Sequence, residues 1–301
     1  MRALRFHSYG DPADVLRLEE TTPPQPGPGQ IRIAVEACGL TPADWAICSG
    51  IHTGDLPRGI GLEVAGTVDS LGPGVTGVKI GDPVFGPAVY TGPSAGAADK
   101  ALLNVWFPRP AGLGAIEAAA LPMAVETAYR GIAALGDVSG RTVLVSGAGT
   151  TIGIAAAQIA RRLGARVIAS AGRTYAGLLR DAGAEVVAYG EGLGGRVTTL
   201  AGGPVDLVFD SAPAGTMPEL LTTVTDPAHI VTMTDFAALK NLGVRSTDMN
   251  LRYDVLGEYA ELAAQGGFTI PIAATYPLEN WREPLAVSRS GQARGKHLLI
   301  P

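Results

Sequence analysis

The chain has 301 residues, 47% of them hydrophobic and 17% charged, which predicts a large apolar core and leaves room for two ordinary domains. The net charge of −5 at pH 7 argues against a nucleic-acid partner, because no basic patch is available to neutralise phosphates. The sequence contains neither a run of about 18 apolar residues, as a membrane helix needs, nor a leader-like apolar segment. We therefore expect a cytoplasmic protein without a membrane partner, whose two cysteines, Cys38 and Cys48, stay reduced.

The first 112 residues are predicted to form an all-β domain. Short runs of alternating apolar residues, for example at 31–35 and 64–68, are separated by turns rich in glycine and proline. The stretch 23–29 reads PPQPGPG, and no helix could cross it. Brief strands between regular turns are typical of a β-barrel or a sandwich.

After Pro110 the pattern becomes one of alternating helices and strands. Apolar residues at helical spacing over 115–121 and 125–135 predict two helices. A strand, a helix and a second strand follow between Val143 and Arg173, and further strands are predicted at 186–189, 205–209 and 230–233. This order predicts a parallel, doubly wound sheet.

The tail, from about Thr269, is predicted to contain a strand, a helix and a last strand at 296–300. A single short strand at this place indicates that the chain returns to complete the first domain. The predicted division is therefore 1–112 with 269–301 for one domain and 113–268 for the other.

A glycine turn between the first two strands of the parallel sheet predicts a dinucleotide site. Gly147, Gly149 and Gly153 stand at G-x-G-x-x-x-G spacing between an apolar, β-branched strand and an alanine-rich helix. A tight turn needs glycine, and the amides at the start of the helix can bind a pyrophosphate. The alternative is a strand–helix–strand unit that binds nothing.

The end of the second strand indicates which dinucleotide is bound. NAD sites usually place an acid there to bind the ribose 2′-hydroxyl, but no Asp or Glu occurs from Ala165 to Arg180. Ser170 ends the strand, and Arg173 follows Gly172 directly after it. An arginine in this place favours a 2′-phosphate, and hence NADPH, over a merely solvated side chain.

The chain resembles the medium-chain dehydrogenase/reductase superfamily, and within it the zinc-independent quinone oxidoreductase-like branch that includes enoyl reductases. The resemblance covers essentially the whole chain and is carried by YGDP (9–12), PGPGQ (26–30), LTPADW (40–45), VAGTV (64–68), LGPGV (71–75), VKIGDPVFG (78–86), AAALP (118–122) and RGK (294–296). It implies an α/β fold with a Rossmann domain and a GroES-like β-barrel catalytic domain that the C-terminal segment completes.

Two departures from the zinc-dependent members of this superfamily imply that no metal is used. Where those members carry a cysteine this chain has Thr41, and where they carry Gly-His-Glu it has Gly61, Leu62 and Glu63. Zinc needs three or four N, S or carboxylate ligands, and a leucine cannot supply one. A zinc-free member needs a substrate that is already polarised, such as an enone, an enal or a quinone.

By the same resemblance, three residues are candidates for the chemistry near the nicotinamide. Thr41 would donate a hydrogen bond to the substrate carbonyl, and Asp44 is either part of the site or a loop residue that caps backbone amides. His52 takes the place of a family tyrosine that acts as a proton donor, and it could donate a proton in the same way. A surface histidine and a proton from water are the alternatives.

The resemblance also extends the set of cofactor residues beyond the glycine turn. Two threonines replace the glycines that relatives usually have there, and their hydroxyls could donate to the pyrophosphate while their bulk narrows its approach. The full set of predicted cofactor contacts is Gly147, Gly149, Thr150, Thr151, Ile152, Gly153, Ser170, Gly172, Arg173, Tyr189, Thr127, Ser211, Thr234, Phe236 and Lys296.

Together these features predict an NADPH-dependent, zinc-independent oxidoreductase that reduces quinones or C=C bonds conjugated to a carbonyl, and that is expected to form a homodimer. One alternative is an NADPH-binding protein with little reductase activity, which serves as a sensor or a structural protein. The other is an enzyme of specialised metabolism that reuses the fold for a different step.

Overall fold

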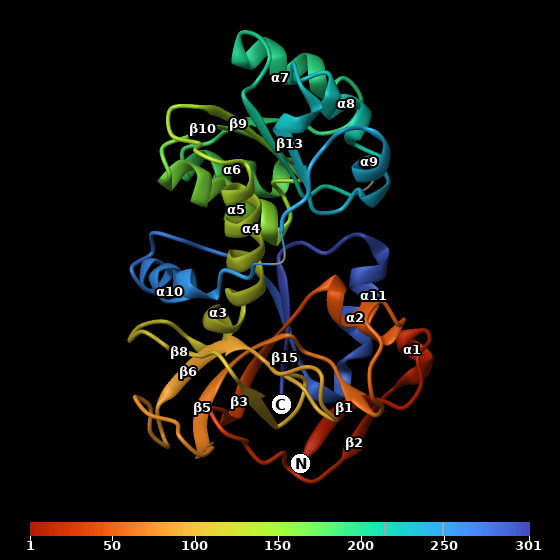
Figure 1. Ribbon diagram of the computed structural model, residues 1–301, viewed down its shortest axis with the longest axis vertical. Helices are drawn as coiled ribbons and strands as arrows, with labels where there is room; N and C mark the ends of the chain where they lie inside the picture. Colours follow the sequence, from red (N-terminus) through yellow and green to blue (C-terminus); the bar gives the residue numbers. More distant parts are fainter. Residues whose placement is uncertain (214, 249) are drawn as a thin grey trace. The chain divides into compact units, whose positions relative to one another are not determined.

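The computed structural model describes residues 1–213, 215–248 and 250–301. They form two compact units: unit 1 comprises Met1–Met123 and Tyr253–Pro301, and unit 2 comprises Ala124–Arg252. Both ends of the chain, red and dark blue in Figure 1, belong to unit 1. None of the helices in the described ranges combines the length and apolar character needed to cross a bilayer.

Unit 2 contains the parallel sheet that the sequence predicts. Its strand order is β11-β10-β9-β12-β13, and every pair is parallel. The bounds are β9 (Thr142–Ser146), β10 (Arg166–Ser170), β11 (Glu185–Val187), β12 (Leu207–Asp210) and β13 (Ile230–Thr232). The carboxyl ends of these strands lie at one edge of the sheet, so the loops that follow them share that edge.

Helices follow the strands of unit 2, as the alternating pattern requires. They are α4 (Pro122–Ala134), which begins in unit 1, α5 (Thr151–Arg162), α6 (Arg173–Asp181), α7 (Leu193–Ala201), α8 (Met217–Leu221), the 3₁₀ turn η1 (Pro227–His229) and α9 (Phe236–Asn241). The face of α5 that packs on the sheet includes Ala155, Ala156 and Ile159, all fully buried. Leu163, which continues the helical spacing of that face, is 41% exposed because the helix ends one residue before it.

Unit 1 is built mainly from antiparallel strands. One sheet has the order β14-β15-β3-β5-β6-β8 with β7 beside β3, and a small sheet has the order β2-β1-β4. The strands are β1 (Arg2–Phe6), β2 (Leu16–Glu20), β3 (Ile31–Leu40), β4 (Arg58–Gly59), β5 (Glu63–Leu71), β6 (Pro83–Pro87), β7 (Lys100–Leu103), β8 (Phe107–Pro108), β14 (Ile272–Pro277) and β15 (Lys296–Ile300). The helical segments of unit 1 are α1 (Pro12–Val15), α2 (Pro42–Cys48), α3 (Ala115–Ala119), η2 (Tyr253–Val255), α10 (Leu256–Ala264), η3 (Leu278–Asn280) and α11 (Arg282–Ser290).

The C-terminal strand completes the sheet of unit 1, which confirms the return predicted from the sequence. β15 runs antiparallel to β3, with His297 opposite Leu40, and parallel to β14 on its other side. Figure 1 shows β15 among strands from the first third of the chain.

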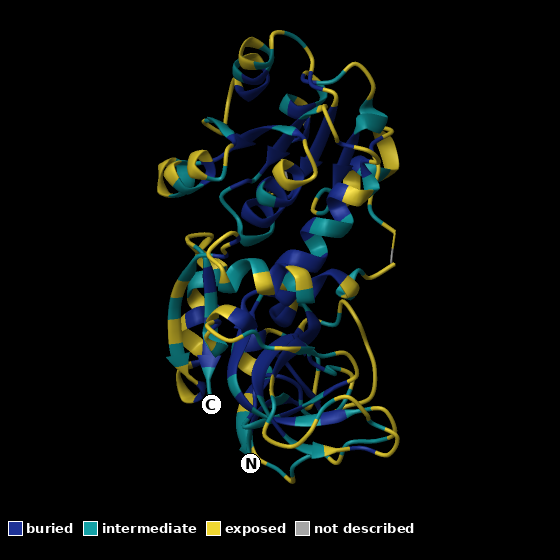
Figure 2. Cartoon of the chain, turned by 90° about the vertical axis from the view of Figure 1, so that its left-hand side faces the viewer, coloured by how far each residue is buried: buried dark blue, intermediate teal, exposed yellow. Residues whose placement is uncertain are grey.

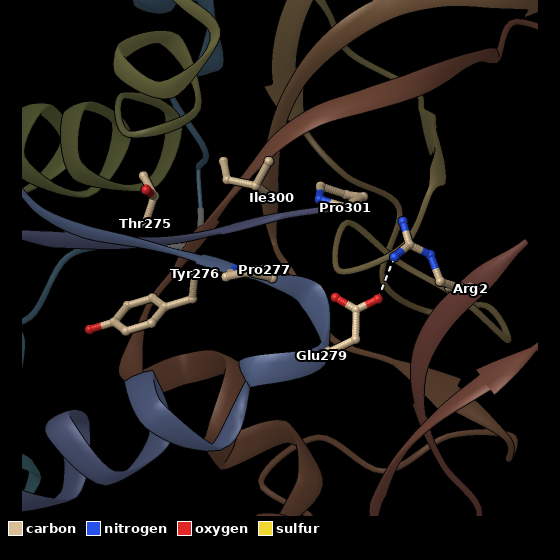
Figure 3. Close-up of a pocket in the computed structure, with 7 residues that line it drawn as sticks. All are labelled: Arg2, Thr275, Tyr276, Pro277, Glu279, Ile300 and Pro301. Atoms are coloured by element: carbon tan, nitrogen blue, oxygen red, sulfur yellow. Dashed lines mark hydrogen bonds and ion pairs between the residues drawn. The ribbon is translucent and has the colours of Figure 1, made fainter.

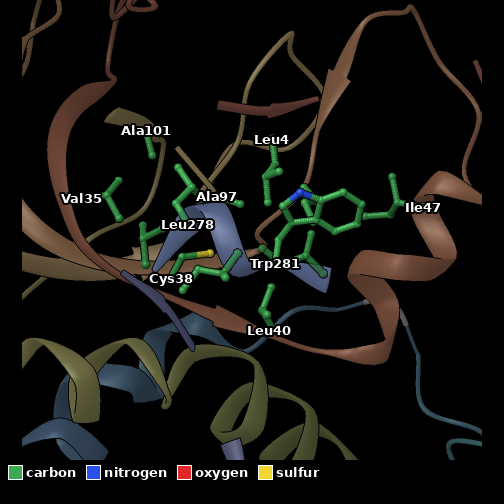
Figure 4. Packing of buried hydrophobic residues seen from close by; sticks show 14 of the residues in the cluster. Leu4, Val35, Cys38, Leu40, Ile47, Ala97, Ala101, Leu278 and Trp281 are labelled. Carbon is green, nitrogen blue, oxygen red and sulfur yellow. The ribbon is translucent and has the colours of Figure 1, made fainter. Parts of the chain in front are cut away.

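The segment between β14 and β15 also contributes to the core of unit 1. Trp281, which is 1% exposed, packs in one cluster with Leu4 of β1, Cys38 of β3 and Ile47 of α2 (Figure 4). Figure 2 shows the buried residues concentrated in the sheets of both units, while the connecting loops are mostly exposed. The C-terminal segment therefore supplies both a strand and a core side chain to a unit that the N-terminal residues begin.

Candidate active site

The glycine turn after β9 has the conformation that a phosphate-binding turn requires. Gly147 has a φ of +73°, and a Cβ built on it would lie 2.6 Å from the amide nitrogen of Ala212, so no other residue fits there. A Cβ on Gly153 would collide with the carbonyl oxygen of Gly147. A Cβ built on Gly149 would have no other atom within 4 Å, so this part of the turn is open to a ligand.

Thr150 caps the helix that the turn leads into. Its Oγ1 accepts a hydrogen bond from the Gly153 amide at 3.0 Å and donates one to the Gly147 carbonyl at 2.9 Å. The amides of Thr151 and Ile152 point out of the first turn without a helical partner, as at every helix N-terminus. The hydroxyl of Thr150 thus stabilises the turn itself, while these two amides are free to bind an anion.

A polar network fixes the loops at the carboxyl ends of the strands beside the turn. Ser211 donates to the carbonyl of Ser146 at 3.1 Å, and its Oγ lies 3.4 Å from Oγ1 of Thr150. Thr234 donates to the carbonyl of Ala212 at 2.6 Å. The predicted residues Ser211 and Thr234 therefore hold backbone in place, and Ser211 lies directly beside the glycine turn.

Asp210 is the buried acceptor of this network. It takes hydrogen bonds from Thr232 Oγ1 at 2.9 Å and from the Ala212 amide at 3.1 Å. Burial raises the pKa of Asp210, and the hydrogen bonds from Thr232 and Ala212 act in the opposite direction. A buried carboxylate with these partners joins the ends of β12 and β13.

Four predicted residues lie at or near the end of β10. Gly172 is the N-cap of α6 and Arg173 is its first residue. A Cβ on Gly172 would lie 3.2 Å from Cε1 of Tyr189, whose side chain is 68% exposed. Arg173 is exposed, and its side chain makes no hydrogen bond or ion pair with any residue that the structure describes. Ser170, at the end of the strand, is buried, and its carbonyl accepts from the amide of Ala148 at 3.0 Å.

The two remaining predicted residues of unit 2 lie on helices. Thr127 is half-buried in α4, where its hydroxyl lies 3.4 Å from the carboxylate of Glu126. Glu126 is fully buried and pairs with Arg130 at 2.7 Å. Phe236 is the first residue of α9 and is 70% exposed. The hydrogen bonds of the described residues do not link Thr127 or Phe236 to the glycine turn.

In unit 1, Asp44 is fully buried, and each of its carboxylate oxygens accepts two hydrogen bonds. One carboxylate oxygen accepts from the amide and the hydroxyl of Thr41 at 2.7 and 2.9 Å, and the other accepts from the amides of Gly61 and Leu62 at 2.8 and 3.0 Å. These four donors saturate the carboxylate. Burial raises the pKa of Asp44, and the hydrogen bonds from Thr41 and Gly61 act in the opposite direction. The geometry favours the loop-capping alternative for Asp44, because the carboxylate joins the start of α2 to the segment before β5.

The same hydrogen bonds limit what Thr41 can do. Its hydroxyl donates its single proton to Asp44, so in this arrangement it can accept a further hydrogen bond but has no proton left for a substrate carbonyl. His52 lies in the exposed loop between α2 and β4. Its imidazole has no hydrogen-bond partner among the described residues, while its carbonyl accepts from Arg58 Nη1 at 2.5 Å.

Lys296 forms a buried ion pair that the sequence did not reveal. Its side chain is 2% exposed and its ammonium pairs with Glu63, which is completely buried. Glu63 Oε2 also accepts from the amide of Met123 at 2.8 Å. Burial raises the pKa of Glu63, and the positive charge of Lys296 acts in the opposite direction. The predicted cofactor residue Lys296 is thus held by a carboxylate within unit 1.

A separate pocket of about 380 Å³ in unit 1 contains none of the predicted residues (Figure 3). It is lined by Arg2, Thr275, Tyr276, Pro277, Glu279, Ile300 and Pro301. Its guanidinium group is already neutralised, since Arg2 pairs with Glu279 and, at 2.7 Å, with Asp99. We assign no ligand to it.

Two family models match the chain. The alcohol dehydrogenase GroES-like domain matches residues 27–122, and the zinc-binding dehydrogenase model matches residues 181–299. A chloroplastic quinone-oxidoreductase homolog from Spinacia oleracea is 31% identical over 226 residues, which are 70% of this chain and 68% of that protein. The matches to the rat, mouse and human quinone oxidoreductases span about half of those proteins, 53% of their length.

Solved structures show the same fold over the whole chain. An NAD-dependent alcohol dehydrogenase has a TM-score of 0.88 at 26% identity, and mycobacterial Rv1454c complexed with NADPH has a TM-score of 0.82 at 26% identity. In both cases the similarity covers 100% of each chain. These likenesses confirm the predicted pair of a GroES-like and a Rossmann-like domain.

The second family model is named for zinc, but the residues of this chain do not fit that metal. Of the relevant positions, Leu62 is apolar, Thr41 is bonded to Asp44, and Glu63 is paired with the Lys296 ammonium. Within the described ranges, no group of three or more His, Cys, Asp or Glu side chains is arranged to hold a metal ion. Glu63 already has a cationic partner, which is the ammonium group of Lys296.

Proposed function

The chain belongs to the medium-chain dehydrogenase/reductase superfamily as a quinone oxidoreductase-like protein, and we propose that it is an NADPH-dependent, zinc-independent reductase of quinones or of C=C bonds conjugated to a carbonyl. Membership of this family supports an oxidoreductase with a nicotinamide cofactor. The choice of NADPH and the substrate class are the proposal, and they depend on the residues of this chain.

The observation that carries the choice of NADPH is the unpaired Arg173 at the end of β10. The names of the structural neighbours include both an NAD-dependent enzyme and a complex with NADPH, so fold alone does not decide. Here the strand end offers a guanidinium without a counter-ion among the described residues and an exposed Tyr189 ring beside Gly172, and it offers no carboxylate that would bind a ribose 2′-hydroxyl. A guanidinium binds a phosphate strongly, and its cost of ordering is low.

In the proposed site, the amides of Thr151 and Ile152 bind the pyrophosphate and Arg173 binds the 2′-phosphate. When bound, the nicotinamide would supply a hydride, so the substrate gains two electrons and needs one further proton to become the neutral reduced product. The imidazole of His52, which is exposed and unpartnered, or water supplies that proton. Lewis-acid activation plays no part in this proposal, since the substrate carbonyl is polarised by conjugation.

The test compares the consumption of NADPH and NADH by the purified chain with 1,4-benzoquinone, a 2-alkenal and a crotonyl thioester as acceptors. We expect oxidation of NADPH with at least one of these acceptors, and a kcat/KM for NADPH at least about tenfold above that for NADH, as one charged hydrogen bond would produce. Equal or better use of NADH would refute the choice of cofactor.

A second candidate, an NADPH-binding protein with little reductase activity, is favoured by one observation. The hydroxyl of Thr41 is directed to Asp44, so Thr41 has no proton left to donate to a substrate carbonyl. This candidate predicts that NADPH quenches or enhances protein fluorescence on binding but is not consumed with any acceptor of the panel.

A further inference from the structure

The loop that carries His52 is exposed, but side chains from outside it hold its backbone. Residues 51–56 are all exposed, and Ile51 is 66% exposed. The loop connects α2 to β4 and contains no strand or helix of its own. Loops of this kind are ordinarily the most mobile part of a domain. Two residues, Tyr9 and Arg58, supply the contacts that regular secondary structure would otherwise give.

Tyr9 binds both backbone groups of one loop residue. Its hydroxyl donates to the carbonyl of Gly54 at 2.9 Å and accepts from the amide of Gly54 at 2.7 Å. The ring is fixed in turn, because it packs against Phe6 with 5.8 Å between the ring centroids. The tip of the loop is therefore fastened to the end of β1.

Arg58 follows the same loop in the sequence, and its side chain binds the backbone near the beginning of the loop. Its Nη1 donates to the carbonyl of His52 at 2.5 Å, and its Nη2 donates to the carbonyl of Tyr90 at 3.3 Å. The guanidinium also lies 5.9 Å from the centre of the Tyr90 ring. One side chain thus joins the His52 loop to the loop after β6.

The charge of Arg58 is unusual for a buried group. The residue is 2% exposed, it forms no ion pair with the residues that the structure describes, and its Nε has no hydrogen-bond partner there. A buried charge without a counter-ion costs free energy, which an apolar side chain of the same length would avoid. What an apolar side chain could not provide is the pair of hydrogen bonds to His52 and Tyr90.

We propose that Arg58 is a positioning residue which, together with Tyr9, holds the loop 51–57 in one conformation and so presents His52 to the substrate. The proposal rests on the proposed function for the role of His52, but the anchoring of the loop does not depend on it. A proton donor on a preformed loop loses less conformational entropy in each turnover than one on a mobile loop.

The experiment compares four variants of the full chain with the wild type. Arg58→Met removes both hydrogen bonds, Arg58→Lys retains the charge and one donor, and Tyr9→Phe removes only the second anchor while the ring stays. Arg32→Met is the matched control, because Arg32 is also largely buried in unit 1 and also donates to a backbone carbonyl, that of Pro24 at 3.0 Å, but touches no residue of the loop. Amide hydrogen exchange of 51–57, the NADPH dissociation constant and the pH profile of kcat with 1,4-benzoquinone are measured for each.

For Arg58→Met we expect exchange in 51–57 to rise at least about tenfold, kcat to fall about tenfold, and the pH dependence of kcat to flatten, while the NADPH dissociation constant stays within about twofold. Arg58→Lys should recover part of the loss, and Tyr9→Phe should show the same changes to a smaller extent. Arg32→Met should leave exchange in the loop unchanged. If Arg58→Met fails to fold, Tyr9→Phe carries the test alone.

Unchanged exchange in 51–57 would overturn the anchor. Faster exchange with an unchanged kcat and pH profile would overturn the positioning of His52. If the wild type consumes no NADPH with any acceptor, the proposed function fails, and the exchange data still decide whether Tyr9 and Arg58 hold the loop.

Discussion

The ammonium of Lys296 and the carboxylate of Glu63 form an ion pair that is almost completely sealed from solvent. Lys296 begins the last strand of the chain and Glu63 begins β5, so the pair joins the C-terminal segment to the centre of unit 1. Through Glu63 Oε2 it also holds the amide of Met123, at the start of α4. A pair of this kind is costly to break from one side, because the remaining charge stays buried.

Lys296→Met should therefore destabilise the protein by about 3–5 kcal/mol at neutral pH, the usual cost of leaving one buried charge unpaired. Adding Glu63→Gln to it should restore part of the loss, since the double variant buries no charge at this place. Urea denaturation of the two single variants and the double variant gives the coupling energy. Strictly additive losses would show that the two side chains do not depend on each other.

Asp210 should make the stability depend on pH. Burial raises its pKa in the folded state above the ordinary value of 3.8, so the folded protein takes up a proton more readily than the unfolded chain. The contribution of Asp210 to the free energy of unfolding is therefore most favourable at pH values below 3.8, and it is lost as the pH rises through the raised pKa. Relative to Asp210→Asn, the wild type should gain stability on acidification. Thermal unfolding of both proteins over a pH series measures the difference, and parallel curves would contradict it.

Arg173→Ala should raise the KM for NADPH about tenfold or more, because a charged hydrogen bond to the 2′-phosphate is lost, and should change the KM for NADH by less than about twofold. Arg180→Ala is the control, since Arg180 lies on the same helix and is exposed. Initial rates with each cofactor give the comparison. Equal effects of Arg173→Ala on the two cofactors would mean that the guanidinium does not distinguish a 2′-phosphate from a 2′-hydroxyl.

Thr41→Val should act mainly on stability. The hydroxyl is bonded to Asp44, so its loss should lower the free energy of unfolding by about 1 kcal/mol and reduce kcat by less than about fivefold. Denaturation and steady-state kinetics are measured on the same preparation. A hundredfold loss of kcat at unchanged stability would instead return Thr41 to the role of oxyanion donor.

His52→Phe should lower kcat and flatten its pH profile, because the proposed proton donor is lost. Thr53→Val, in the same exposed loop, is the control for a change of surface. Identical pH profiles for wild type and His52→Phe would identify water as the proton source.

The parts of the fold that follow from local pattern were predictable from the sequence. The apolar, β-branched run before Gly147 and the alanine-rich face of α5 lie where the spacing placed them, and the single strand at 296–300 returns to unit 1 as expected. These predictions needed only the period of the apolar residues and the positions of glycine and proline.

The site chemistry that depends on distant partners was not predictable in this way. Nothing near Lys296 in the sequence indicates Glu63, and nothing near Asp44 indicates the amides of Gly61 and Leu62, since these pairs form only when the strands assemble. Arg58 was missed for the same reason, although an arginine between Pro57 and a buried glycine offers a weak signal. Sequence pattern indicates which face of an element is buried, but not which buried polar group meets which.

The position of β15 between β3 and β14 has a consequence for the order of events during synthesis on the ribosome. Unit 2 is a single continuous stretch, and all of its strands have been made once residue 252 has left the exit tunnel. Unit 1 lacks an inner strand and the Trp281 core side chain until the last fifty or so residues emerge. The nascent N-terminal residues therefore remain partly folded, with Cys38–Leu40 of β3 unpaired on the side of β15, while the unit encoded after them is completed first.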